Sequence, residues 1–147
     1  NAARMRALDD YALACGGKPD VEGIVRAYLH PVFERLRNGG RGFNNFAALI
    51  ALANNSELWG GGTVKEYFDS AVQRLIELLR LALPKAREVD LYWGYQFISG
   101  ALTLSYSRNN RIEGLSRGRC RANDYAAIEP RLVEWCTAGI RAIGSRR

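Results

Sequence analysis

Apolar residues recur along much of this chain with the spacing of an α-helix. The clearest stretch follows Asp20, where the apolar positions fit i, i+3, i+4 and i+7: Val21, Ile24, Val25, Tyr28, Leu29, Val32, Phe33 and Leu36. Asp20 suits the start of this helix, and Asn38-Gly39-Gly40 ends the pattern. Because Pro31 lies inside it and has no backbone donor, the sequence predicts a helix that kinks there.

Five other segments carry helical signals. They are residues 2–14, about 44–53, 64–83, 88–107 and the last part of 122–144. Glycines at 60–62 mark a break, and a capping box at Thr63-Val64-Lys65-Glu66 opens the helix that Pro84 ends. Pro130 is expected in the first turn of the last helix, after a short piece capped by Asn123-Asp124. Since no segment alternates with a period of two, the sequence predicts an all-α fold of about six helices.

The last two long helices have the composition of a dimer interface. The 88–107 helix has no charged residue after Asp90, so it is expected to be buried on more than one side. Small residues in both helices would let another helix approach closely. The predicted interface comprises Gly100, Ala101, Leu104, Leu132, Trp135 and Gly139. The alternative is that both helices are simply buried in one monomer.

Length and composition indicate a single globular domain. The chain has 147 residues, of which 48% are hydrophobic and 24% charged. We expect no membrane span, because no apolar run approaches about 18 residues, and no signal peptide, because no charged-then-apolar leader opens the chain. Three cysteines without metal-ligand spacing and one histidine argue against a zinc site or a disulfide framework, and favour a cytoplasmic protein.

The net charge of +6 is concentrated in one segment. Residues 108–121 contain five arginines and a single acidic residue, Glu113. A nucleic-acid groove would spread its charge along a helix or sheet face. We therefore interpret this segment as a solvated basic loop, with a contact to an anion or nucleic acid as the alternative.

The sequence offers little for catalysis. His30 is the only imidazole, no G-x-S-x-G elbow is present, and no glycine-rich stretch forms a phosphate loop. The acidic residues are scattered at helix starts and on polar faces. We expect a protein that is not an enzyme, with no catalytic residues, no metal and no cofactor.

A cavity for a small molecule is a better fit to the residues available. His30 is either packed at the kink or half exposed, or it is a polar group at the rim of such a cavity, because a bend at Pro31 would open space between helices. Ligand sites have mostly apolar walls with a few polar groups. The predicted walls are Phe33, Phe46, Ile50, Leu75, Leu79, Trp93 and Phe97, with Tyr28, His30, Tyr92 and Gln96 as polar contacts.

The order of several segments resembles the C-terminal effector-binding and dimerisation domain of TetR-type transcriptional regulators. These segments are RAYLHPVFERL at 26–36, GRGFNNFAALIAL at 40–52, EYFDSAVQRLIELLRLALP at 66–84, DLYWGYQFISGAL at 90–102, LSRGRC at 115–120 and RLVEWCTAGIRAI at 131–143. The closest subgroup in pattern is that of fatty-acid-responsive sigma regulators. The four arginines from 111 to 121 depart from that pattern.

The resemblance implies a modular regulator. Residues 1–14 would be the end of the helix that links an N-terminal helix-turn-helix domain, absent from these residues, to a ligand-binding and dimerisation domain over 15–147. The protein would be a homodimer, and DNA would be bound only through the N-terminal domain. The effector would be mostly apolar, an acyl chain or a flat aromatic molecule.

Two other classes of function stay open at this point. One is a small α-helical enzyme or carrier with an apolar cavity, which predicts a group of perturbed titratable residues in that cavity. The other is a helical interaction domain without a ligand, which predicts no cavity.

Overall fold

The computed structural model of the protein describes residues 1–54, 56 and 63–145, and it describes side chains outside 57–68. All regular structure in these residues is helical, which confirms the predicted all-α class. The helices are α1 (Ala2–Ala14), α2 (Val21–Asn38), α3 (Gly40–Asn54), α5 (Thr63–Ala82), α6 (Glu88–Tyr106), α7 (Arg111–Leu115) and α8 (Tyr125–Gly144). The predicted break at 60–62 and the side chains of the predicted capping box lie outside the described residues.

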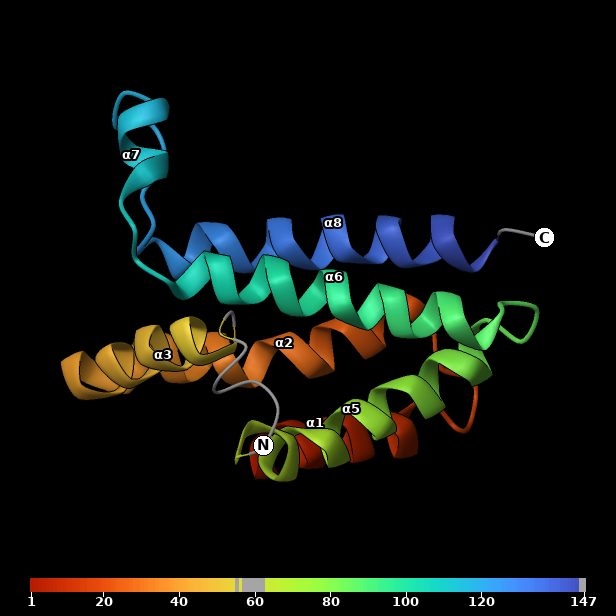
Figure 1. The fold of residues 1–147 in the computed structure, drawn as a ribbon. Coiled ribbons are helices and arrows are strands. Elements are labelled where there is room, and N and C mark those ends of the chain that lie inside the picture. Colours follow the sequence, from red (N-terminus) through yellow and green to blue (C-terminus); the bar gives the residue numbers. More distant parts are fainter. Residues whose placement is uncertain (55, 57–62, 146–147) are drawn as a thin grey trace.

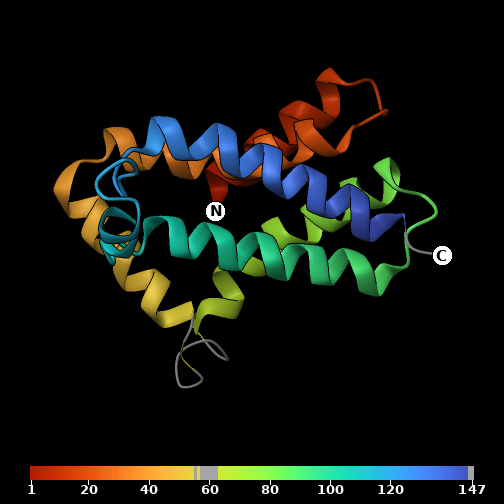
Figure 2. The ribbon, with the colours of Figure 1, turned by 90° about the horizontal axis from the view of Figure 1, so that it is seen from above.

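The helices form two layers. The long helices α6 and α8 lie side by side and cover α1, α2 and α5 (Figures 1 and 2). Helix α2 packs on both α8 and α1, and α3 packs on α6 and α2. The short helix α7 stands away from the layer where α6 ends (Figure 1). One face of the α6/α8 layer therefore has no other described segment of the chain packed over its length.

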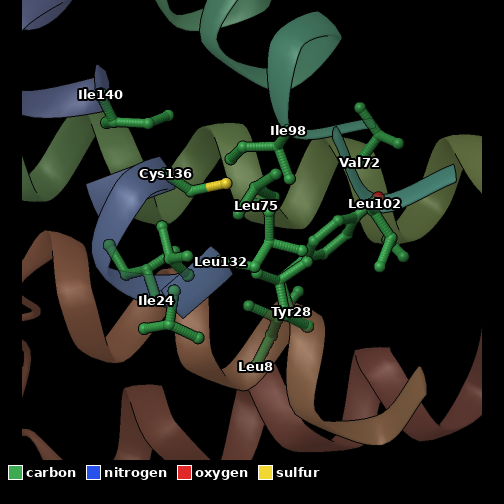
Figure 3. Close-up of a cluster of buried hydrophobic side chains, with 14 of the residues drawn as sticks. Leu8, Ile24, Tyr28, Val72, Leu75, Ile98, Leu102, Leu132, Cys136 and Ile140 are labelled. Atoms are coloured by element: carbon green, nitrogen blue, oxygen red, sulfur yellow. The ribbon is translucent and has the colours of Figure 1, made fainter. Parts of the chain in front are cut away.

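The core lies between these layers. Figure 3 shows Leu8 of α1, Tyr28 of α2, Leu75 of α5 and Leu132 of α8 converging on one cluster. Leu8 and Leu75 are completely inaccessible to solvent. Burial of such side chains contributes about 1.5–3 kcal/mol each, so this cluster holds α1, α2, α3, α5, α6 and α8 together.

The turn between α1 and α2 is fixed by Asp20, as the sequence predicts. One carboxylate oxygen of Asp20 accepts a hydrogen bond from the amide of Gly23 at 3.0 Å, and the other accepts one from the Tyr11 hydroxyl at 2.8 Å. Gly23 is required here, because an added Cβ would lie only 2.2 Å from the Tyr11 ring. These hydrogen bonds lower the pKa of Asp20 below its ordinary value.

Three segments differ from the sequence prediction. Helix α3 begins at Gly40, four residues before the expected start, because packing against α2 and α6 outweighs the low helix propensity of Gly40 and Gly42. The basic segment expected as a loop contains α7. Pro130 lies inside one continuous α8, which starts after the Asp124 cap. Pro130 is the sixth residue of α8, so it removes one backbone hydrogen bond, the one to the Ala126 carbonyl, and the helix continues through it.

Candidate ligand cleft and dimer face

A cleft of about 380 Å³ lies where four helices meet near the start of α1. Its walls come from the first turns of α1, the second half of α2, the middle of α3 and the end of α6. The lining residues are Asn1, Ala2, Ala3, Arg4, Arg6, Pro31, Val32, Arg35, Phe43, Phe46, Ala47, Ile50 and Tyr106. This volume falls within the range of about 300–1,000 Å³ typical of small-molecule sites.

Two of the predicted cavity residues line this cleft. Phe46 and Ile50 both come from α3, which presents Ala47 between them. Phe46 is 55% exposed and contacts the ring of Phe43 at 6.2 Å between centroids. The two rings form an aromatic rim, and Ala47, which is 6% exposed, lies deeper.

Four other predicted cavity residues belong to the core instead. Tyr28, Phe33, Leu75 and Leu79 are between 0% and 3% exposed and are part of the main hydrophobic cluster. Burial raises the pKa of the Tyr28 phenol, so this group stays protonated at neutral pH. These four residues are part of the core, and none of them lines the cleft.

The predicted cavity residues of α6 lie on the outside of the molecule. Trp93 and Phe97 are 55% and 51% exposed and stack on each other with ring centroids 6.0 Å apart. Tyr92 and Gln96 are also exposed. None of these four side chains lines the cleft described above.

His30 is exposed and belongs to an ion-pair network between α2 and α8. Its Nδ1 lies 2.6 Å from a carboxylate oxygen of Glu129, and the Arg37 guanidinium donates to the other oxygen. The Glu129 side chain is only 11% exposed. Burial alone would raise the pKa of this carboxyl, but the hydrogen bonds from Arg37 and His30 outweigh it, so the pKa lies below its ordinary value.

Glu129→Gln is expected to lower the free energy of unfolding by about 1–2 kcal/mol at pH 7, because Arg37 loses its anionic partner and His30 loses its contact with the carboxylate. A carboxyl whose pKa is lowered by folding stabilises the native state above the ordinary pKa of 4.5. That contribution is lost as the pH falls through the folded-state pKa. Urea unfolding at pH 7 and pH 3 should therefore show a smaller difference at the lower pH. Glu134→Gln, at an exposed position of the same helix, is the control, and an equal difference at both pH values would contradict the assignment.

The sequence analysis missed the positive charge of the cleft. Arg4 and Arg6 come from α1 and Arg35 from α2. Tyr106 closes the far wall, and burial raises the pKa of its phenol. No sequence pattern marked Arg4, because the residues around it in the fold are distant in the chain.

The outer face of the α6/α8 layer carries an apolar stripe. On α6 it runs along one side of the helix with spacings of three and four residues. Its large members are Val89, Trp93, Phe97 and Leu104 on α6 and Trp135 on α8, each between 51% and 65% exposed. Contiguous apolar surface of this kind marks an interaction site in a folded domain.

The glycines of these helices distinguish the two sides of the layer. A Cβ at Gly94 would lie 2.8 Å from the Ile140 side chain, so Gly94 allows α6 and α8 to pack closely. A Cβ at Gly100 or Gly139 would meet nothing within 4 Å. These two glycines therefore leave open space on the outer face, where another helix could approach.

The structure separates the six predicted interface residues into two sets. Gly100, Leu104, Trp135 and Gly139 lie on the outer face. Leu132 is 8% exposed and points into the core, as Figure 3 shows. Ala101 also packs against the core.

A second groove adjoins the outer face where α7 stands away from the layer. It has a volume of about 690 Å³ and an apolar floor that includes Leu104, Ile112, Leu115 and Trp135. Ile112 and Leu115 are 43% and 71% exposed. The segment predicted as a basic loop thus contains a short helix, α7, whose apolar side chains Ile112 and Leu115 extend the apolar surface of the outer face.

Comparison with known protein families identifies the fold. The family model described as "Tetracyclin repressor-like, C-terminal domain" matches residues 26–139. The chain belongs to this family. Comparison with the curated proteins and with the solved structures gives no match. The tetracyclin repressor-like match runs from Arg26 in α2 to Gly139 in α8. It includes the outer face and the α2, α3 and α6 walls of the cleft, but not the residues of α1 that line the cleft.

Membership gives the general role of the domain. Tetracyclin repressor-like C-terminal domains bind ligands and dimerise in transcriptional regulators of the TetR type, and they are regulatory rather than catalytic. The fatty-acid-responsive subgroup stays a prediction. Among the described helices, none has both the length and the apolar character needed to cross a membrane.

Proposed function

We propose that this chain senses a mostly apolar small molecule for a cytoplasmic, DNA-binding regulator of the TetR type. We further propose that the regulator is a repressor that the ligand releases from DNA. The observation that carries the proposal is the position of the cleft, which contacts the first turns of α1. In the proposed domain organisation, residues 1–14 end the helix that leads from an N-terminal DNA-binding domain.

A ligand in the cleft would contact α1 and the body of the domain together. Arg4 and Arg6 of α1 line the cleft together with Val32 of α2 and Ile50 of α3. A ligand shifts a conformational equilibrium only if it binds the two arrangements with different affinity. Because the cleft exists only where α1 meets α2, α3 and α6, a ligand there would favour one position of α1.

The outer face of α6 and α8 supplies the proposed dimer contact. Two copies related by a two-fold axis would bury the stripe that includes Trp93, Phe97 and Trp135. The open space at Gly100 and Gly139 would let the helices of the two copies approach closely. A stable dimer is expected to bury about 1,200 Å² or more in total.

Ala47→Trp tests the ligand site. The indole would fill the cleft from α3, so binding of a neutral apolar probe, 2-naphthamide, should be lost in isothermal titration calorimetry. In the unchanged protein, the probe at a hundredfold excess over its Kd should stabilise the fold by about 2.7 kcal/mol. Thermal unfolding with and without probe measures this stabilisation, which the variant should not show.

Asn45→Trp is the matched control, because it places the same indole at an exposed position of α3 that does not line the cleft. It should bind 2-naphthamide as the unchanged protein does. Both variants should keep the same sedimentation coefficient. Full binding by Ala47→Trp would refute the cleft as the ligand site.

A further inference from the structure

The cleft combines an apolar wall with concentrated positive charge. Three arginines line it, Arg4, Arg6 and Arg35, and the guanidinium carbon of Arg35 lies 4.9 Å from the centroid of the Phe43 ring. Among the residues that the structure describes, no aspartate or glutamate lines it. Phe43 and Phe46 supply the largest apolar surfaces. An uncharged ligand would use the apolar wall and leave the positive charge uncompensated.

Arg4 is the least solvated of these three cations. The residue is 8% exposed, and its guanidinium carbon lies 4.5 Å from the centroid of the Tyr28 ring. Its Nε is buried and has no hydrogen-bond partner. A buried donor without a partner costs about 1–3 kcal/mol, and more when the group is charged. A ring face offsets part of this cost, but it does not accept the Nε–H.

Other arginines of the chain show how a partly buried guanidinium is normally satisfied. Arg37 is paired with Glu129, and Arg74 with Asp9 and Glu77. Arg4, Arg6 and Arg35 form no ion pair among the described residues. Their positions around one cleft leave room for an acceptor that the described part of the chain does not supply.

We propose that the cleft is selective for an apolar molecule that carries one carboxylate, with the carboxylate against Arg4 and the apolar part against Phe43, Phe46 and Ile50. This inference rests on the proposed ligand-sensing function and adds the charge class of the ligand. The carboxylate would pair with the Arg4 guanidinium, and charge-assisted hydrogen bonds of this kind are stronger than neutral ones. Such a ligand would pair Arg4 of α1 while its apolar part contacts α3.

The test compares two probes of the same shape, 2-naphthoate and 2-naphthamide, by isothermal titration calorimetry at pH 7. We expect the protein to bind the carboxylate at least about tenfold more tightly than the amide, which corresponds to about 1.4 kcal/mol. Arg4→Gln should remove this preference, because the carboxylate loses its cationic partner. Arg26→Gln is the matched control, because Arg26 is exposed, pairs with Glu22 and does not line the cleft.

Arg4→Lys serves if Arg4→Gln does not fold, as judged by circular dichroism. A lysine keeps the charge but loses the planar guanidinium and its Nε, so an intermediate preference is expected. The affinities of the two probes for the unchanged protein also test the charge selectivity without any variant. Equal affinity for both probes would overturn the selectivity, and so would an unchanged preference in Arg4→Gln.

The Ala47→Trp variant separates this inference from the proposed function. If both probes bind equally and both are lost in Ala47→Trp, the cleft is the ligand site and only the charge selectivity is wrong. If Ala47→Trp retains binding of both probes, the proposed site is wrong as well. Absence of binding by either probe at about 1 mM would overturn both proposals.

Discussion

Trp135→Glu is expected to convert the proposed dimer into monomers. The indole is 61% exposed in the single chain and, with Leu104, lines the groove that continues the outer face. Truncating or charging a central aromatic residue of an interface typically costs about 2–4 kcal/mol, which would raise the Kd of the dimer roughly 30- to 1,000-fold. Sedimentation velocity over a range of concentrations measures the change. Since the side chain is exposed in the single chain, the fold should persist.

Leu81→Glu is the control for the dimer prediction. Leu81 is 62% exposed on α5, and the substitution introduces the same charge away from the α6/α8 face. It should leave the association unchanged. Phe97→Glu on α6 should reproduce the effect of Trp135→Glu. A Trp135→Glu protein that associates as tightly as the unchanged protein would place the dimer contact elsewhere.

Helical periodicity predicted most of the fold because each long helix buries one stripe. The cap at Asp20 and the pairing of Arg74 with Glu77 are local, so they follow from residues three apart in the sequence. The start of α3 was wrong because Gly40 and Gly42 have low helix propensity, which packing against α2 and α6 overrides. Helix α7 has only five residues, too few for a periodic signal.

The ligand site was harder to predict because α6 is apolar on both sides. Ile98 and Leu102 face the core, whereas Trp93 and Phe97 face outward. Helical periodicity alone does not show which of these two apolar sides is buried. The sequence therefore suggested a cavity for aromatic residues that the structure places on the outer face. Arg4 lies 24 residues from Tyr28 and 102 from Tyr106 in the chain, and only the fold brings the three together.

Leu75 was predicted to line a cavity, but the structure places it in the core. Its side chain is completely inaccessible and lies in the cluster with Tyr28 and Leu132 (Figure 3). Leu75→Ala is therefore expected to lower the free energy of unfolding by about 2–5 kcal/mol, the range observed when a packed core leucine is truncated. Urea unfolding at a fixed protomer concentration measures this loss, because association makes the apparent stability depend on concentration.

Leu81→Ala is the matched control for the core prediction. The same atoms are removed from the same helix, but at a position that is 62% exposed, so the free energy of unfolding should change by less than about 0.5 kcal/mol. A residue that lines a ligand cavity already lacks partner atoms on one side, so its truncation forfeits fewer contacts than truncation in a packed core. If Leu75→Ala lowers the free energy of unfolding by less than about 1 kcal/mol, Leu75 lines a cavity instead. A loss in the expected range, with 2-naphthamide still bound, would place the ligand in the cleft of α1, α2, α3 and α6 and leave Leu75 to the core.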